Sequence, residues 1–91
     1  MKDLKNYIVS LNSTIKKTIS SLEATASQIV LVVDNKKLKG TVTDGDIRRA
    51  LLKGKTLDSK VKKIMNKDFK FLSKSATEKD ALALMKKEIL K

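Results

Sequence analysis

A short apolar run between polar stretches constrains the fold of this chain more than any other feature. Residues 28–33 read Gln-Ile-Val-Leu-Val-Val, a β-branched run too short for a helix. A continuous run of this kind is typical of a strand that is buried on both faces of a sheet. The polar residues 34–37 then predict a turn, and alternating apolar and polar residues over 38–43 predict a second, half-buried strand. We therefore expect a β-hairpin at the centre of an α+β fold.

The spacing of apolar residues predicts a helix on each side of this hairpin. Ser13 or Thr14 can cap the first helix, whose apolar positions recur at three and four residues until about Ala26. The second helix is short and covers residues 44–53, and Gly54 follows at the position where helices commonly end. Both helices are thus adjacent in sequence to the predicted hairpin.

The C-terminal third is predicted to contain three further elements. Apolar residues at helical spacing indicate a linker helix within residues 55–68. Residues 69–72 are compatible with a short strand, and residues 77–90 with a final helix. Two pairs near the start of that helix fit a capping box. These pairs are Ser75 with Glu78 and Thr77 with Asp80.

A weak internal repeat relates the two ends of the chain. When the sequence is shifted by 63 positions, residues 8–22 match residues 71–85 in the pattern of short strand, polar cap and amphipathic helix. The hairpin of the second unit would then fall after residue 91. We therefore expect a truncated second unit and an uncovered apolar face on the first, which favours a homodimer.

Composition limits the chemistry that is open to this chain. Histidine, cysteine and proline are absent, so catalysis or metal binding would depend on carboxylates, lysines and hydroxyls. This excludes most familiar enzyme constellations. No apolar segment is long enough for a signal peptide or a membrane span, so we expect a soluble, cytoplasmic chain without a membrane partner.

The net charge of +11 is unevenly distributed, with +2 over residues 1–46 and +9 over residues 47–91. Such an excess raises nucleic acid or phosphorylated ligands as partners. A solvated lysine face is the preferred interpretation. One tyrosine and two phenylalanines are too few to stack bases, so nucleic acid is not the expected partner.

The segment Gly-Thr-Val-Thr-Asp-Gly-Asp-Ile-Arg-Arg at residues 40–49 lies at the junction between the second predicted strand and the helix after it. Such junctions bind anions, because the first N–H groups of a helix lack intrahelical partners. Thr43 offers a hydroxyl, Gly45 allows close approach to the backbone, and Asp46 can accept both hydroxyls of a ribose. Arg48 or Arg49 could pair with a phosphate. The segment therefore favours a nucleotide-binding site.

Two other interpretations of the same residues stay open. Thr43 and Asp46 also have the spacing of a capping box, in which case they stabilise the helix and nothing binds. Asp44 and Asp46 could instead hold Mg²⁺ or Mn²⁺, although no further ligand or general base is evident. Spacing alone does not choose between nucleotide binding and capping.

The chain resembles the CBS motif, named after cystathionine β-synthase, over residues 29–34, Ile-Val-Leu-Val-Val-Asp, and residues 38–52, Leu-Lys-Gly-Thr-Val-Thr-Asp-Gly-Asp-Ile-Arg-Arg-Ala-Leu-Leu. Together with Ile-Met-Asn at 64–66, these residues resemble the N-terminal CBS pair of sugar-nucleotide nucleotidyltransferases. Sugar-phosphate isomerases have a similar Thr-Asp-Gly-Asp-x-Arg-Arg segment. The resemblance implies a β-α-β-β-α motif over residues 1–54, a linker helix over 55–68 and a truncated second motif over 69–91.

The resemblance also implies a function and a site. CBS motifs bind adenine nucleotides through a threonine or serine and an aspartate three residues later, which here are Thr43 and Asp46. The adenine would lie against Ile29 and Val30, and Gly45 would contribute only its backbone. Asp44 and Arg48 are further expected ligand-binding residues. We expect a non-catalytic regulatory module that binds AMP, ADP or ATP and requires no cofactor or metal. This module would control a catalytic domain downstream. An oligomerisation scaffold without a ligand is the alternative.

Overall fold

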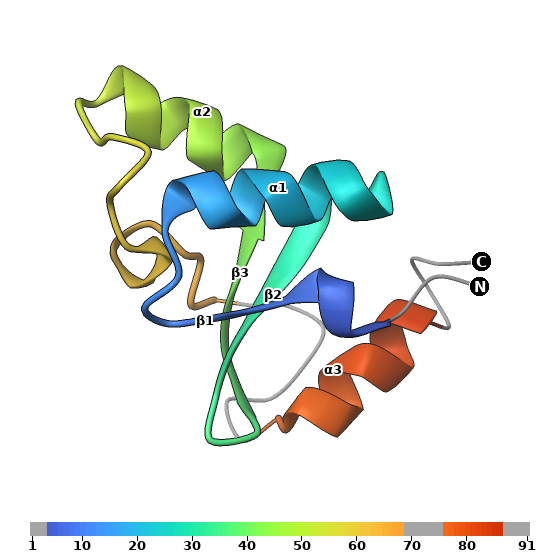
Figure 1. The fold of residues 1–91 in the computed structure, drawn as a ribbon. Coiled ribbons are helices and arrows are strands. Elements are labelled where there is room, and N and C mark those ends of the chain that lie inside the picture. The colour runs from blue at the N-terminus through green and yellow to red at the C-terminus, as the bar shows by residue number, and fades with distance from the viewer. Residues whose placement is uncertain (1–3, 69–75, 87–91) are drawn as a thin grey trace.

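The computed structural model describes residues 4–68 and 76–86, and their sheet has three strands. The strands are β1 (Ile8–Ser10), β2 (Ile29–Asp34) and β3 (Lys37–Thr43), in the order β1-β2-β3. β1 runs parallel to β2, and β2 runs antiparallel to β3. The four central residues of β2 are buried, which confirms the strand predicted from the apolar run. The α+β class is likewise confirmed (Figure 1).

The hairpin turn is tighter than the sequence suggested. Asp34 pairs with Lys37, so only Asn35 and Lys36 form the turn, with φ angles of 50° and 63°. Two adjacent residues with positive φ are typical of a type I′ turn, whose twist matches that of the two strands. A register shift at Val32 and Val33 then moves the pairing by one residue. As a result Ile29 lies opposite Thr43, at the end of the sheet where the candidate site begins.

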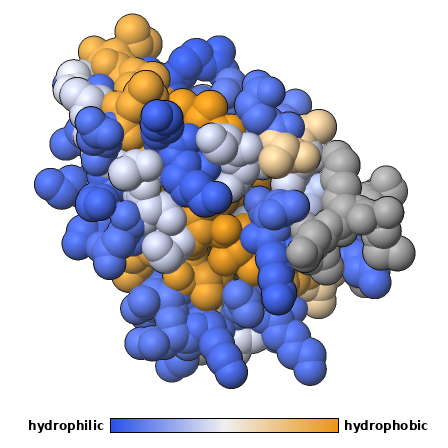
Figure 2. Space-filling view, viewed as in Figure 1, coloured by the Kyte–Doolittle hydropathy of each residue, from blue (hydrophilic) through white to orange (hydrophobic). Residues whose placement is uncertain are grey.

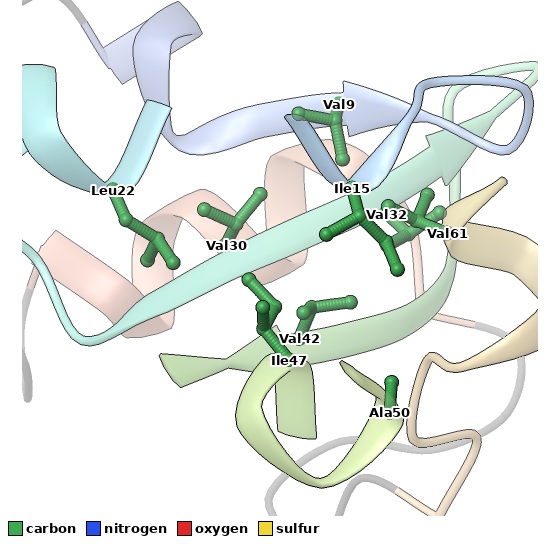
Figure 3. Close-up of a cluster of buried hydrophobic side chains, with 9 residues drawn as sticks. All are labelled: Val9, Ile15, Leu22, Val30, Val32, Val42, Ile47, Ala50 and Val61. Atoms are coloured by element: carbon green, nitrogen blue, oxygen red, sulfur yellow. The ribbon is translucent and has the colours of Figure 1, made fainter. Parts of the chain in front are cut away.

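Helices α1 (Ile15–Thr25) and α2 (Asp44–Leu52) cover one face of this sheet (Figure 1). The Thr14 side chain caps α1 by accepting the Lys17 N–H, and Ala26 ends the helix in the left-handed conformation. Both helices therefore agree with the sequence prediction to within one or two residues. Between them and the sheet lies a core of nine buried residues (Figure 3). They are Val9, Ile15, Leu22, Val30, Val32, Val42, Ile47, Ala50 and Val61.

Helix α3 (Glu78–Leu84) lies on the opposite face of the sheet (Figure 1). Its approach is fixed by two backbone hydrogen bonds to the hairpin, from Leu38 N–H to the Ala76 oxygen (2.9 Å) and from Glu78 N–H to the Lys36 oxygen (2.8 Å). A second core of buried residues forms here, and it includes Tyr7 from the short 3₁₀ helix η1 (Leu4–Tyr7). Helix α3 therefore covers part of the second face of the sheet, whereas the sequence led us to expect an uncovered apolar face.

The predicted linker helix over residues 55–68 is also wrong. The segment consists of turns and one short 3₁₀ helix, η2 (Val61–Lys63). Two of its backbone oxygens accept N–H groups from the first turn of α1, which have no partner within that helix. These bonds join Ile15 to Ser59 (2.9 Å) and Lys16 to Leu57 (3.0 Å).

Two predictions fall outside the described residues. The strand at 69–72 and the last part of the helix predicted over 77–90 belong to segments that the structure does not describe. Within the described residues, the helix begins after Thr77, and Thr77 and Asp80 form the predicted capping box. None of the helices within residues 4–68 and 76–86 is both long and apolar enough to cross a membrane.

Candidate functional site

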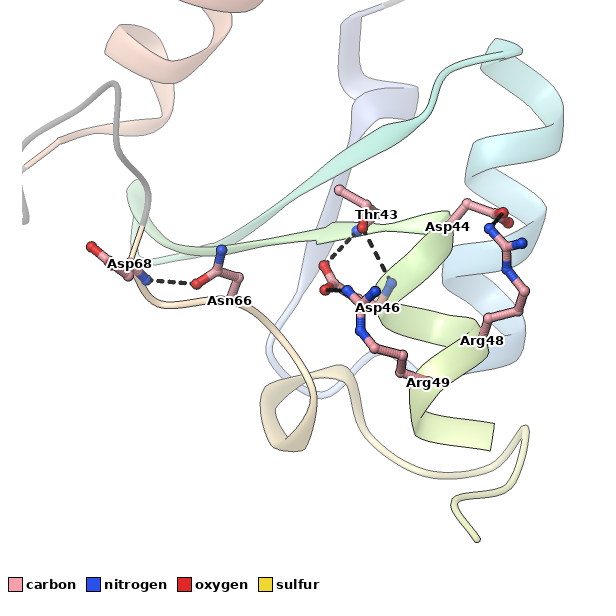
Figure 4. A network of polar contacts seen from close by, with 7 residues as sticks. All are labelled: Thr43, Asp44, Asp46, Arg48, Arg49, Asn66 and Asp68. Carbon is pink, nitrogen blue, oxygen red and sulfur yellow. Dashed lines mark hydrogen bonds and ion pairs between the residues drawn. The ribbon is translucent and has the colours of Figure 1, made fainter. Parts of the chain in front are cut away.

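Thr43 and Asp46 bond to each other at the junction of β3 and α2. The Thr43 hydroxyl accepts the Asp46 N–H at 3.2 Å, and the Asp46 carboxylate accepts the Thr43 N–H at 2.9 Å (Figure 4). This is a complete capping box, which satisfies two backbone donors at the helix start. The capping box predicted from the spacing of Thr43 and Asp46 is therefore confirmed.

Each of the two neighbouring acidic residues pairs with an arginine one turn further along α2. Arg48 donates to Asp44 and Arg49 donates to Asp46, both at 2.8 Å (Figure 4). In the described residues, no group of three or more acidic, histidine or cysteine side chains could hold a metal ion. Since the two carboxylates are directed to different arginines, the geometry gives no support to a shared Mg²⁺ or Mn²⁺ site.

An open groove of about 810 Å³ lies between the end of α1, the start of β2 and the first turns of α2. Five of the seven residues predicted to bind a ligand line it. These are Ile29, Thr43, Asp44, Gly45 and Arg48. The structure thus brings the start of the first hairpin strand and the helix after the hairpin together at one surface.

The other two predicted residues lie outside the lining of the groove. Val30 is fully buried in the core between the sheet and the two helices. Asp46 lines a smaller hollow of about 250 Å³ on the neighbouring side of α2. Their ligand contacts therefore stay predictions, and the side chain of Val30 has a structural role in this chain.

Sequence reasoning missed the wall of the groove that α1 contributes. Six residues from the end of this helix and the loop after it complete the lining: Ile19, Leu22, Glu23, Ala26, Ser27 and Gln28. The signal was present in the hairpin, because an antiparallel pair places the residues before its first strand beside those after its second. The register shift at Val32 and Val33 then sets which of these residues lie opposite one another.

The groove combines an apolar wall with a polar rim. Ile19, Leu22 and Ile29 provide a surface against which a flat ring could lie, and Thr43 provides a hydroxyl. Gly45 leaves the backbone of the first turn of α2 accessible from the groove. This arrangement suits recognition of a ring that has a polar or anionic substituent.

A comparison with protein families matches residues 1–53 to the CBS domain. The chain belongs to the CBS domain family. CBS domains are regulatory, non-catalytic modules that commonly bind adenine nucleotides and typically pair up. The match covers more than half of the chain.

Individual proteins are similar to this chain over part of their length. An uncharacterized protein of Helicobacter pylori strain J99 is 50% identical over 44 residues, which are 48% of this CBS chain and 13% of that protein. The crystal structure of a putative acetoin utilization protein (AcuB) from Vibrio cholerae has a TM-score of 0.68 at 24% identity, over 88% of this chain and 61% of that one. The chain therefore spans less than two thirds of these relatives.

A third relative is the CBS domain protein PAE2072 from Pyrobaculum aerophilum, which was solved in complex with AMP. It has a TM-score of 0.64 and 18% identity, and the match covers 88% of this chain and 63% of that one. At this identity the likeness extends to the fold.

Proposed function

We propose that this CBS domain binds an adenine nucleotide in the groove between α1, β2 and α2 and acts as a regulatory module of a longer protein. The observation that carries the proposal is the meeting of Ile29, Thr43, Gly45 and Arg48 around one groove. The AMP complex of a protein with the same fold supports an adenine nucleotide as the ligand class. AMP, ADP and ATP are all candidates.

In this proposal each part of the nucleotide contacts different residues. The adenine lies against the apolar wall that includes Ile29. The ribose hydroxyls donate to Asp46, which lines the adjoining hollow, and the phosphate accepts from the Thr43 hydroxyl and from Arg48. No cofactor or metal takes part in this mode of binding.

The capping box is compatible with this role. Each oxygen of a carboxylate can accept two hydrogen bonds, and those of Asp46 each accept one, from Thr43 N–H and from Arg49. The Asp46 side chain is 19% exposed, which leaves it accessible from one side. The Thr43 hydroxyl accepts the Asp46 N–H and still has its own proton to donate.

The resemblance to CBS pairs of known enzymes supports further proposals about the parent protein, its regulation and its assembly. The segment from Gly40 to Arg49 and residues 64–66 favour a cytoplasmic sugar-nucleotide nucleotidyltransferase as the parent protein, with a sugar-phosphate isomerase as the alternative. Nucleotide binding would change the relative stability of two arrangements of the module and thereby bias the neighbouring catalytic domain. A second copy of the chain would complete the paired arrangement as a homodimer.

Thermal unfolding with and without AMP, ADP and ATP tests the proposal. A nucleotide at a hundred times its Kd stabilises the folded state by about 2.7 kcal/mol, so we expect a clear rise in Tm. Asp46→Ala should abolish that rise. Asp80→Ala is the matched control, because Asp80 has the same position in the capping box of α3 and is absent from the groove lining.

Both variants should lower the Tm of the ligand-free protein, and only Asp46→Ala should remove the response to nucleotide. A second candidate function, an oligomerisation scaffold without a ligand, is favoured by the complete capping box at Thr43 and Asp46. If none of the three nucleotides raises the Tm of the wild-type protein, the scaffold is the correct interpretation and the nucleotide proposal is wrong.

A further inference from the structure

The small hollow beside Asp46 is lined mainly by basic residues. Its volume is about 250 Å³, and it lies between one side of α2 and the segment that follows this helix. Asp46, Arg49, Ala50 and Lys53 have helical spacing and therefore share one face of α2 or its end. Lys55, Lys63 and Ile64 complete the lining.

The charges in this hollow do not balance. Four cationic side chains and one carboxylate line it, and the carboxylate of Asp46 already pairs with Arg49 at 2.8 Å. Lys53, Lys55 and Lys63 have no ion-pair partner within residues 4–68 and 76–86. Three ammonium groups around one concave surface create a positive potential that attracts an anion with several charges.

The hollow adjoins the groove at the first turn of α2. Gly45 lines the groove, and the next residue, Asp46, lines the hollow. The Arg49 guanidinium lies beside this turn, because its Nη1 would lie 3.3 Å from a Cβ placed on Gly45 while its Nη2 donates to Asp46. A ligand bound at Thr43 and Asp46 can therefore reach both sides of this turn.

We infer that the hollow binds the terminal phosphates of a nucleoside di- or triphosphate whose base occupies the groove. This rests on the proposed function and narrows it: ADP and ATP bind more tightly than AMP. Lysine ammonium groups donate charge-assisted hydrogen bonds to phosphate oxygens, and Arg49 can add a bidentate contact if it exchanges Asp46 for phosphate. A monophosphate is too short to use this second set of donors.

Isothermal titration calorimetry with AMP, ATP and inorganic tripolyphosphate tests the inference. A variant with Lys53→Gln, Lys55→Gln and Lys63→Gln should bind ATP about tenfold or more weakly, with little change for AMP. A control with Lys17→Gln, Lys39→Gln and Lys67→Gln removes the same charge from exposed lysines that line neither the groove nor the hollow. The control should keep the affinity of the wild-type protein for ATP to within about twofold.

The outcomes separate this inference from the proposed function. If AMP binds as tightly as ATP, or if both lysine variants lose ATP affinity equally, the hollow is no phosphate site although the groove still binds a nucleotide. If no nucleotide binds but tripolyphosphate does, and the first variant alone loses it, the hollow binds polyphosphate anions, and its assignment to a nucleotide is wrong together with the proposed function. If neither nucleotide nor tripolyphosphate binds, both are wrong.

Discussion

Gly40 of β3 lies so close to Met65 that no side chain fits between them. A Cβ placed on Gly40 would lie 2.8 Å from the Met65 sulfur and 2.9 Å from the backbone oxygen of Asn66. Asn66 holds this position through two backbone hydrogen bonds with Thr41, at 2.8 and 2.9 Å. Two of the parts of the sequence that resemble the CBS family, residues 38–52 and 64–66, are thus in direct contact.

Replacing Gly40 by alanine should destabilise the protein. The new methyl group would meet the backbone oxygen of Asn66 as well as the Met65 side chain, and insertion into such close packing costs about 1–3 kcal/mol. Urea unfolding followed by circular dichroism measures the loss. Gly45→Ala is the control, because its nearest neighbour is the flexible end of Arg49 at 3.3 Å. Equal stability of the Gly40→Ala and wild-type proteins would contradict the contact.

Acid should weaken the attachment of α3. A hydrogen bond from the Thr77 backbone N–H, with a further one that involves the Thr77 hydroxyl, holds the pKa of Asp80 below its usual 3.8. A folded-state pKa below the unfolded one means that the carboxylate stabilises the fold above about pH 3.8 and loses this effect as the pH falls through the lower value. The difference in unfolding free energy between the wild-type protein and Asp80→Asn should therefore shrink from pH 5 to pH 2. A constant difference would show that the carboxylate charge is irrelevant.

Neighbouring residues of β2 should separate stability from binding. Val30 is fully buried in the core, so Val30→Ala should cost about 1.5–3 kcal/mol in urea unfolding and leave nucleotide affinity unchanged at temperatures where the protein is folded. Ile29 is partly exposed and lines the groove, so Ile29→Ala should lower nucleotide affinity more than stability. A large loss of affinity in Val30→Ala alone would place the base elsewhere.

Exposed leucines near the end of α2 form a candidate contact surface for the predicted homodimer. Figure 2 shows apolar surface at this end of the molecule, where Leu52 is 86% and Leu57 46% exposed. If a second copy covers them, Leu52→Lys with Leu57→Lys should shift sedimentation velocity from dimer to monomer. Ala24→Lys, on the exposed side of α1, should leave the dimer intact. A wild-type monomer at high concentration would refute the predicted homodimer.

Features carried by neighbouring residues were predictable from the sequence. The cap at Thr14, the buried strand at 29–33 and the capping box of Thr43 with Asp46 each depend on residues within a few positions of one another. Their physical causes, which are side-chain hydrogen bonds to the helix start and the periodicity of apolar residues, act locally. The family resemblance was visible for the same reason, since its motifs are contiguous.

The separation of the candidate site into a groove and a basic hollow was not predictable from neighbouring residues alone. Gly45 and Asp46 are adjacent in sequence, yet one lines the groove and the other the basic hollow. The groove needs the end of α1 as its wall, and the hollow needs Lys55 and Lys63 from the segment after α2. Which surface a residue faces depends on these distant partners.

The sequence by itself determined the helix caps, the hairpin and the residues gathered at the start of α2, because local hydrogen bonds and side-chain periodicity specify them. Only the tertiary structure decided that residues 55–68 form turns and a short 3₁₀ helix in place of a linker helix, and that α3 covers the second face of the sheet. In both cases backbone groups find partners far away in sequence, at the start of α1 and along the hairpin, and those long-range bonds replace what local helical spacing alone would favour.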